Sequence, residues 1–176
     1  MGSQNKPATN GLAANDEQES AYAQLTDYLD RNDYSYTGDE DQSLVLMKLM
    51  GTHNSFQLHF HLATNGPVKR ILMYSVYPIK APPERRATVA EFILRINYQL
   101  ATAVFEMDMK DGELRVKYVL NTDAERISHP LMGAMIYNNI EVADRYMPPL
   151  FAVAFGYASP DTALEMMEAH GQSVLQ

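Results

Sequence analysis

The sequence predicts an α+β fold in which helices pack on an antiparallel sheet, with elements in the order α-βββ-α-ββ-αα. Three observations predict it. Residues 56–62 alternate apolar and polar side chains, which is typical of a half-buried strand. The dipeptides Asn65-Gly66 and Asp111-Gly112 favour tight hairpin turns, and tight turns join antiparallel strands. Before, between and after these strands, apolar residues recur at helical spacing.

The N-terminal part changes character near residue 15. Residues 1–14 are small and polar and are expected to form a disordered tail, which leaves 15–172 as a single domain. Asn15 is a typical N-cap for a helix that Asn32 would end. The apolar face of this helix comprises Ala21, Leu25, Tyr28 and Leu29.

Three strands are expected next, at 43–50, 56–62 and 68–77. The first is apolar on both faces. The second turns one set of side chains inward and another outward, namely Phe56, Leu58, Phe60 and Leu62 against Gln57, His59 and His61. A two-residue turn at Asn65-Gly66 fixes the register between the second and third strands. The expected pairs are Phe60 with Ile71, His61 with Arg70, His59 with Leu72 and Gln57 with Tyr74.

Prolines and a second hairpin follow. Pro78, Pro82 and Pro83 predict an extended loop, and Pro83 also suits the first turn of a helix that runs to about Leu100. The buried face of that helix comprises Val89, Phe92, Ile93, Ile96 and Leu100. A two-residue turn at Asp111-Gly112 then predicts three opposite-charge pairs on a solvated outer face. These pairs are Glu106 with Lys117, Asp108 with Arg115 and Lys110 with Glu113, and the other face joins Phe105, Met107 and Met109 to Tyr118, Val116 and Leu114.

The C-terminal part is expected to be helical. Ser128 is a candidate N-cap and Pro130 suits the first turn. The apolar spacing is carried by Met132, Met135, Ile136 and Ala143. Pro148-Pro149 is expected to kink or restart the helix, and 150–157 favours a buried helix over a strand. Ser159-Pro160 opens a last short helix that Gly171 ends.

Composition excludes several classes of function. The 176 residues include no cysteine, which rules out disulfides and thiolate sites and fits a cytoplasmic protein. The net charge of −8 and the shortness of the basic runs, Lys69-Arg70 and Arg85-Arg86, argue against nucleic acid as a partner. No apolar run approaches the roughly 18 residues that a membrane span needs, and no signal peptide is recognisable.

Candidate chemistry is sparse, so no catalytic, cofactor-binding or metal-binding residue is assigned. His59 and His61 share one strand face at a spacing that some metal sites use, which keeps a small metal-dependent or hydrolytic enzyme as an alternative. Against this, the predicted register sets Arg70 opposite His61, and no carboxylate completes the site. The acidic run Asp39-Glu40-Asp41 is expected to be a solvated loop that could bind calcium weakly.

One face of the first sheet is too apolar for free water and too polar for a sealed core. Mixed faces of this kind occur at interfaces, and they also occur where a terminal helix covers them. The face is expected to combine Val45, Met47, Leu49, Leu72 and Tyr74 with Gln57, His59 and His61. The candidate partner-binding residues are Val45, Met47, Leu49, His59, Leu72 and Tyr74.

Several spaced motifs in the second half of the chain carry a family resemblance. They are Asn97-Tyr98, Phe105-Glu106-Met107-Asp108, residues 111–117, Asn139, and Asp144-Arg145-Tyr146-Met147-Pro148. Together they resemble the YbjN-like family, whose members are classed as candidate bacterial sensory transduction regulators. The resemblance runs from about Leu25 to Gly156 and is closest to the cyanobacterial and plastid branch. Ala103-Val104 departs from the family pattern, in which a glycine precedes the Phe-Glu pair.

The resemblance implies a fold similar to that of type III secretion chaperones, which are small acidic proteins that dimerise and hold a partner chain. It carries over no catalytic residue. The leading hypothesis is therefore a non-enzymatic binding or regulatory module that holds another protein and forms a homodimer. The rivals are the His59/His61 enzyme and a structural subunit of a larger assembly, which would be unstable alone.

Overall fold

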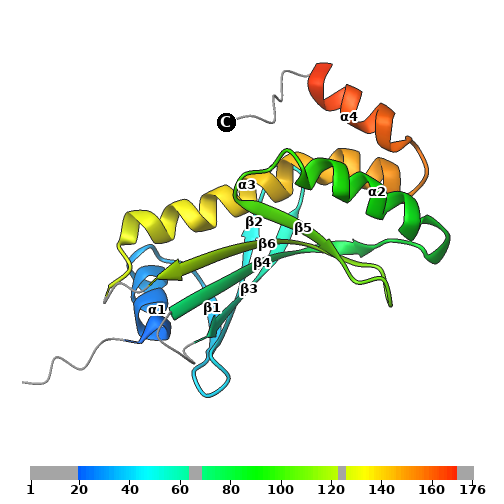
Figure 1. Ribbon diagram of the computed structural model, residues 1–176. Helices are drawn as coiled ribbons and strands as arrows, with labels where there is room; N and C mark the ends of the chain where they lie inside the picture. The colour runs from blue at the N-terminus through cyan, green and yellow to red at the C-terminus, as the bar shows by residue number, and fades with distance from the viewer. Residues whose placement is uncertain (1–19, 64–68, 123–125, 170–176) are drawn as a thin grey trace, which may run out of the picture.

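The computed structural model describes residues 20–63, 69–122 and 126–169, and its mixed architecture confirms the predicted α+β class. The described strands form one antiparallel sheet in the order β1-β2-β3-β4-β6-β5, with α3 lying along one face and α2 beside it (Figure 1). In chain order the elements are α1 (Ala21–Arg31), β1 (Tyr36–Asp39), β2 (Leu44–Met50), β3 (Ser55–Ala63), β4 (Lys69–Lys80), the 3-10 turn η1 (Pro83–Arg85), α2 (Arg86–Asn97), β5 (Ala103–Met107), β6 (Glu113–Thr122), α3 (His129–Ala154) and α4 (Pro160–Ala169).

One face of the sheet is buried beneath the helices. The predicted inward residues of the second strand are confirmed, because Phe56, Leu58 and Phe60 are fully buried and Leu62 nearly so. They join the apolar faces of the helices in one continuous core. The fully buried helical residues of that core include Leu25, Leu29, Phe92, Ile96, Met132 and Leu150.

The first helix begins later than the sequence predicts. Its N-cap is Ser20, whose hydroxyl accepts a hydrogen bond from the Ala23 N–H at 3.0 Å. Asn15, the predicted cap, lies outside the described residues, and the extended backbone at Ser20 shows that α1 starts at Ala21. Asn32 ends the helix as predicted.

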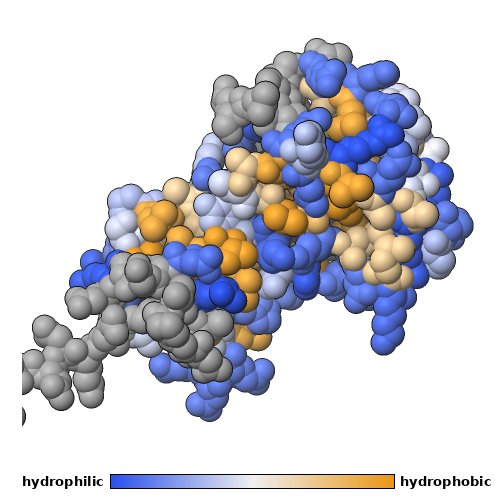
Figure 2. Space-filling model, in the orientation of Figure 1, coloured by the Kyte–Doolittle hydropathy of each residue, from blue (hydrophilic) through white to orange (hydrophobic). Residues whose placement is uncertain are grey.

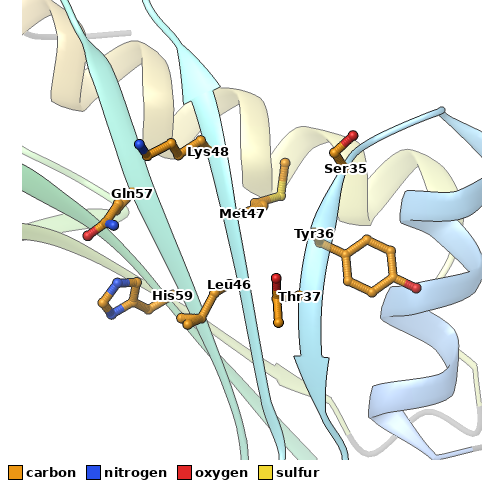
Figure 3. A pocket seen from close by; sticks show the side chains of 8 residues that line it. All are labelled: Ser35, Tyr36, Thr37, Leu46, Met47, Lys48, Gln57 and His59. Carbon is orange, nitrogen blue, oxygen red and sulfur yellow. The ribbon is translucent and has the colours of Figure 1, made fainter.

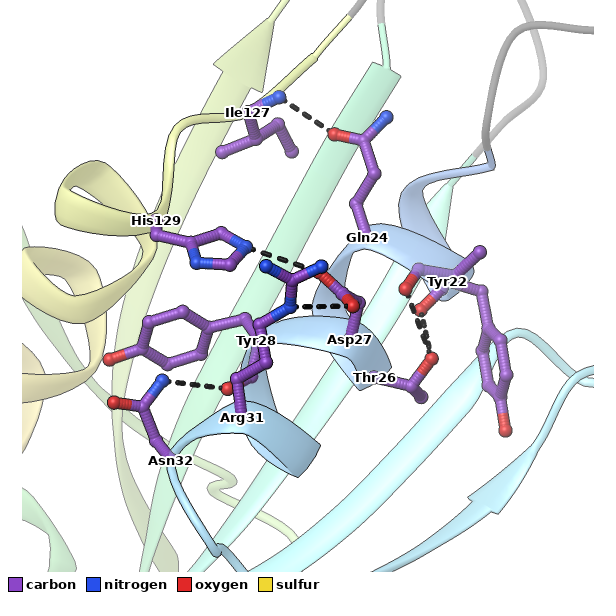
Figure 4. A network of polar contacts seen from close by, with 10 residues as sticks. Tyr22, Gln24, Thr26, Asp27, Tyr28, Arg31, Asn32, Ile127 and His129 are labelled. Carbon is purple, nitrogen blue, oxygen red and sulfur yellow. Dashed lines mark hydrogen bonds and ion pairs between the residues drawn. The ribbon is translucent and has the colours of Figure 1, made fainter.

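Polar contacts join α1 to the beginning of α3 (Figure 4). The side-chain oxygen of Gln24 accepts the Ile127 N–H at 2.7 Å, and the Asp27 carboxylate faces the His129 ring at 3.2 Å. Arg31 also contacts Asp27, and its hydrogen bond is the main reason why the pKa of that carboxyl lies below its usual range. These contacts hold two elements together that are about 100 residues apart in the sequence.

The sheet has one strand more than the sequence predicts. β1 pairs with β2 through a short segment that contains Gly38 and Asp39, which are both poor strand formers. Gly38 is needed there because a Cβ would collide with the hydroxyl of Tyr22 on α1. Tertiary contacts therefore decide this strand, and local propensity does not reveal it.

Both predicted hairpin registers are wrong by two residues, although the faces are right. Phe60 pairs with Met73, and His59 pairs with Tyr74, so the β3–β4 register differs by two residues from the one that a turn at Asn65-Gly66 would give. Asn65-Gly66 lies outside the described residues. The predicted pairs Phe60–Ile71, His61–Arg70, His59–Leu72 and Gln57–Tyr74 are replaced by Phe60–Met73, His61–Leu72, His59–Tyr74 and Gln57–Val76.

The second hairpin closes with a longer loop, because of the two predicted turn residues only Gly112 adopts a positive φ, of 84°, whereas a two-residue type I′ turn needs both. Its N–H donates to the Asp108 carbonyl, so the loop spans the residues between them. The ladder therefore pairs Glu106 with Arg115, and Glu106 also forms an ion pair with Lys117. The predicted Asp108–Arg115 and Lys110–Glu113 pairs do not form, and Glu113 pairs with Lys80 in the neighbouring strand.

Prolines interrupt the elements less than expected. β4 continues through Pro78 to Lys80, with an irregular register between Val76 and Lys80 that accommodates the missing N–H. α3 likewise runs through Pro148 and Pro149 without restarting. Each proline removes one helical hydrogen bond, and the full burial of Leu150, Val153 and Ala154 in the next turn offsets that loss.

The outer edge of β5 is blocked by a side chain. Asn97, the last residue of α2, accepts the Phe105 N–H at 2.8 Å and donates to the Phe105 carbonyl at 2.9 Å. One amide thus occupies both backbone groups of Phe105, at the middle of the edge that a further strand would use. Val104 on the same strand is exposed, so an unblocked edge would offer apolar contacts as well.

Asn97→Ala is expected to lower the free energy of unfolding by about 1–3 kcal/mol, because it leaves both backbone groups of Phe105 without their partner. It is also expected to promote concentration-dependent association through the free edge. Urea unfolding and sedimentation velocity measure the two effects. Asn121→Ala is the control, since that side chain accepts an exposed bond from Arg70, and an equal loss in the control would contradict the edge-blocking role.

Candidate functional site: the open face of the sheet

The second face of the sheet, opposite the helices, is named here the open face. Cross-strand partners share a face, so the pairings define it directly. Its central row crosses all six strands of the described sheet through Thr37, Leu46, His59, Tyr74, Lys117 and Val104. The next row contains Asp39, Leu44, His61, Leu72 and Val119. Within the described residues no helix covers this side (Figure 1).

The structure divides the predicted partner-binding residues between the two faces. His59, Leu72 and Tyr74 lie on the open face. Val45, Met47 and Leu49 do not, because they pair with Phe60, Leu58 and Phe56 and so belong to the helix-covered face. The predicted face is therefore wrong for these three residues. β2 is apolar on both sides, so its own pattern does not show which side chains face the helices, and its pairing with β3 decides this.

Apolar side chains remain partly exposed on the open face. Leu46, Val104 and Val119 are 37%, 42% and 36% exposed. Leu72 and Tyr74 lie between them and are half-buried by their neighbours. An uncovered sheet that combines apolar and polar side chains is typical of a contact surface for another molecule.

The polar groups at the centre of the open face contact one another. The Arg115 guanidinium lies 4.2 Å from the centre of the Tyr74 ring, and the His61 ring meets the edge of Tyr74 with centres 5.5 Å apart. Burial, and then the neighbouring His61, lower the pKa of His59. His59 is therefore neutral near pH 7. The contacts among Arg115, Tyr74 and His61 fix the positions of these side chains.

A shallow hollow of about 300 Å³ opens at the β1–β3 side of the open face (Figure 3). Leu46 lies between Thr37 and His59, and Lys48 and Gln57 stand beside it. Met47 points away from this group, toward the helices. The hollow has room for a single side chain of a partner, and its one charged lining residue is Lys48.

The alternative metal-dependent enzyme gains no further ligand from the fold. In the described ranges no group of three His, Cys, Asp or Glu side chains is placed to hold a metal ion. The corrected register sets Leu72, and not Arg70, opposite His61. The nearby carboxylate of Glu106 is engaged by Arg115 and Lys117, which outweigh its burial and keep its pKa below the usual range.

Sequence reasoning missed a second polar cluster, where α3 meets the β2–β3 connection. The Asp144 carboxylate accepts the backbone N–H groups of Thr52 and His53 at 3.0 and 2.8 Å, and it meets His53 Nδ1 at 3.0 Å. A Cβ on Gly51 would collide with this carboxylate, so the connection approaches α3 closely. Burial raises the pKa of Asp144, but the His53 and Thr52 N–H groups and the His53 ring together hold it below its usual range.

Two further motif residues of α3, Asn139 and Tyr146, also face the interior. The Ser75 hydroxyl donates to the side-chain oxygen of Asn139, and both residues are completely buried. Tyr146 packs edge-on against Phe105 with ring centres 5.2 Å apart. Together with Asp144, these contacts attach α3 to β4, β5 and the β2–β3 connection. Asn139, Asp144 and Tyr146 of the family motifs therefore help to hold the fold together. Other motif side chains line pockets: Glu106, Asp108 and Arg115 line one of about 470 Å³, and Arg145 and Asp144 line another of about 640 Å³.

The helical side also exposes apolar residues, although as a more broken surface. Figure 2 shows hydrophobic patches over the helices that are separated by hydrophilic residues. The exposed large residues of α2, α3 and α4 include Leu94, Phe151 and Met166. A groove of about 360 Å³ lies between α3 and α4, and His53 and Arg145 line it together with the two helix prolines.

None of the helices in the described part of the chain has both the length and the apolar character that crossing a bilayer requires.

Comparison with known proteins identifies relatives of the chain. A family model described as "YbjN: Putative bacterial sensory transduction regulator" matches residues 21–152. Among solved structures, the chain is similar to YbjN from E. coli, described as "a putative transcription regulator". That likeness has a TM-score of 0.58 at 16% identity and covers 77% of this chain and 93% of that chain, so it shows a common fold. No curated protein matches the chain at a significant level.

Proposed function

The chain belongs to the YbjN family, and on that premise we propose that it is a non-enzymatic module that binds another protein in a regulatory role. The observation that carries the proposal is the open face, a six-stranded sheet surface that no described helix covers and on which Leu46, Val104 and Val119 are exposed. The internal position of the motif side chains supports a binding role, because Asn139 and Asp144 are engaged in holding α3.

The proposal extends to the manner of action. We propose a chaperone-like or signalling-associated homodimer in the cytoplasm, with a fold similar to that of type III secretion chaperones. The acidic net charge of −8 and the absence of cysteine support a protein partner and a reducing compartment. Fold similarity alone does not determine function, so the partner must be identified by experiment.

The test is capture from a native lysate on the immobilised chain, with excess free chain as competitor. We expect one or a few proteins whose capture saturates and is abolished by competition, together with a dimer in light scattering. A monomer that captures nothing competable would contradict the proposal. Stoichiometric zinc in protein purified without a His-tag, lost on His59→Ala, would instead favour the enzyme that uses His59 and His61.

A further inference from the structure

We propose that the open face binds an acidic segment of a partner protein, which sets an apolar side chain against Leu46 and a carboxylate beside Lys48. This inference rests on the proposed function, because it names the kind of partner segment that a binding module with this surface would hold.

The paired strand residues of the open face carry more positive than negative charge, unlike the rest of the chain. By the pairings, they include five basic residues, Lys48, Arg70, Lys80, Arg115 and Lys117, against three acidic residues, Asp39, Glu106 and Glu113. Asp111 of the β5–β6 loop forms an ion pair with Lys80 and Asp108 lies at the same end, so the positive excess lies toward Lys48 and Arg70. The whole chain has 14 basic and 22 acidic residues, which leaves nine basic against nineteen acidic elsewhere. A positive face on an acidic protein favours a negatively charged partner and disfavours the chain's own remaining surface.

The surplus positive charge has a definite position. Lys48 and Arg70 are both exposed, and the Arg70 guanidinium bonds the neutral amide of Asn121. Arg115 and Lys117 share the single carboxylate of Glu106, so this trio also retains one positive charge. These positive charges lie on both sides of the apolar residues of the open face. A carboxylate of the partner would therefore lie near a positive charge on whichever side of the apolar residues it binds.

The hollow in Figure 3 defines the anchoring point. Its volume of about 300 Å³ suits one apolar side chain resting on Leu46, and Lys48 is its only charged lining residue. A carboxylate next to that apolar side chain in the partner would therefore find a cation at the rim. Addition of a partner strand at β5 is the less favourable mode, since Asn97 occupies the backbone groups of Phe105.

A protein segment fits the open face better than a nucleic acid does. Binding of single strands relies on bare aromatic faces for base stacking. Tyr74 is the aromatic residue of the central row, and Arg115 lies over its ring. The net charge of −8 also repels a phosphate backbone at long range.

The experiment uses a fluorescent peptide of alternating Glu and Leu, titrated with the full chain and followed by anisotropy. We expect saturable binding that weakens at high salt, and a loss of affinity of about tenfold or more in Lys48→Glu/Arg70→Glu. The matched control is Arg31→Glu/Lys110→Glu, which changes the net charge equally at exposed positions away from the open face and is expected to bind almost normally. Lys48→Gln/Arg70→Gln provides a milder variant if the reversal does not fold.

Each remaining outcome overturns the inference in a recognisable way. Equal affinity for a peptide of alternating Lys and Leu would mean that the face is merely apolar. Binding of oligothymidine in place of the peptide would make it a nucleic-acid surface, and self-association lost in Lys48→Glu/Arg70→Glu would make it a contact between two copies. If this variant still captures the same lysate protein as the wild type, the proposed function stands and the assignment of the open face fails.

Discussion

Asp144→Ala is expected to lower the free energy of unfolding by about 2–4 kcal/mol. The carboxylate side chain is only 11% exposed and is the acceptor for the N–H groups of Thr52 and His53. Its removal leaves these donors unpaired beneath α3 and breaks the contact that fixes the β2–β3 connection. Because that connection sets the register between β2 and β3, its loosening is expected to weaken the pairing of these strands as well.

The measurement is urea unfolding followed by circular dichroism. Glu141→Ala is the control, because Glu141 lies one turn earlier in the same helix and pairs with Arg145 at the surface. An exposed pair of this kind contributes about 1 kcal/mol or less. A loss for Asp144→Ala no larger than that of Glu141→Ala would show that the carboxylate does not hold the connection.

The difference in stability between the wild type and Asp144→Ala is expected to depend on pH. The pKa of Asp144 in the folded chain lies below its usual value, so the stabilisation is complete above the unfolded pKa of about 3.9 and is lost as pH falls through the folded value. The difference in stability between wild type and Asp144→Ala is therefore expected to be constant near neutrality and to shrink below about pH 4. A difference that grows on acidification would reverse the assigned sign.

Local patterns in the sequence predict elements and faces well. The alternation in 56–62 correctly separates Phe56, Leu58 and Phe60 from His59 and His61, because a half-buried strand must place successive side chains on opposite faces. Helical spacing likewise identifies the buried sides of α1, α2 and α3. These features depend on neighbours along the chain, which a sequence displays directly.

Register and pairing depend on contacts that a sequence does not display. Asn-Gly and Asp-Gly predict two-residue turns, and the observed pairs differ from the predicted ones by two residues while the faces stay the same. β2 lacks alternation, so nothing local distinguishes its two sides, and the predicted face of Val45 and Met47 is wrong. Of the candidate partner-binding residues, His59, Leu72 and Tyr74 lie together on the open face, whereas those of β2 lie on the helix-covered face.

The cluster around Asp144 unites residues about 90 positions apart, so no spacing rule reveals it. Asn139 is different, because it lies four residues after Met135 and four before Ala143, on the buried face of α3. A polar side chain at such a position must find an internal partner, and that signal could have identified Asn139 from the sequence alone.

Asn139→Ala is expected to lower the free energy of unfolding by about 2–4 kcal/mol, because it opens a cavity and leaves the Ser75 hydroxyl unpaired in the core. Ser75→Ala is expected to cost about 1–3 kcal/mol for the matching reason. The double variant is expected to lose about 1 kcal/mol less than the sum of the two single losses, since each single change already breaks the shared hydrogen bond. Asn138→Ala, one residue earlier and exposed, is the control and should stay within about 0.5 kcal/mol.

The decisive variant is Ser75→Ala/Asn139→Leu, which replaces both polar partners by apolar groups and restores most of the volume. The side-chain NH2 group of Asn139 lacks a hydrogen-bond partner among the described residues, so the native pair is incompletely satisfied. An apolar replacement is therefore expected to regain most of the stability lost in the alanine variants. If the pair only joins α3 to β4, this variant must bind the acidic peptide and the captured lysate protein as the wild type does. A stable variant that has lost both would show that the buried amide communicates with the open face through β4, where Ser75 lies next to Tyr74 in the chain.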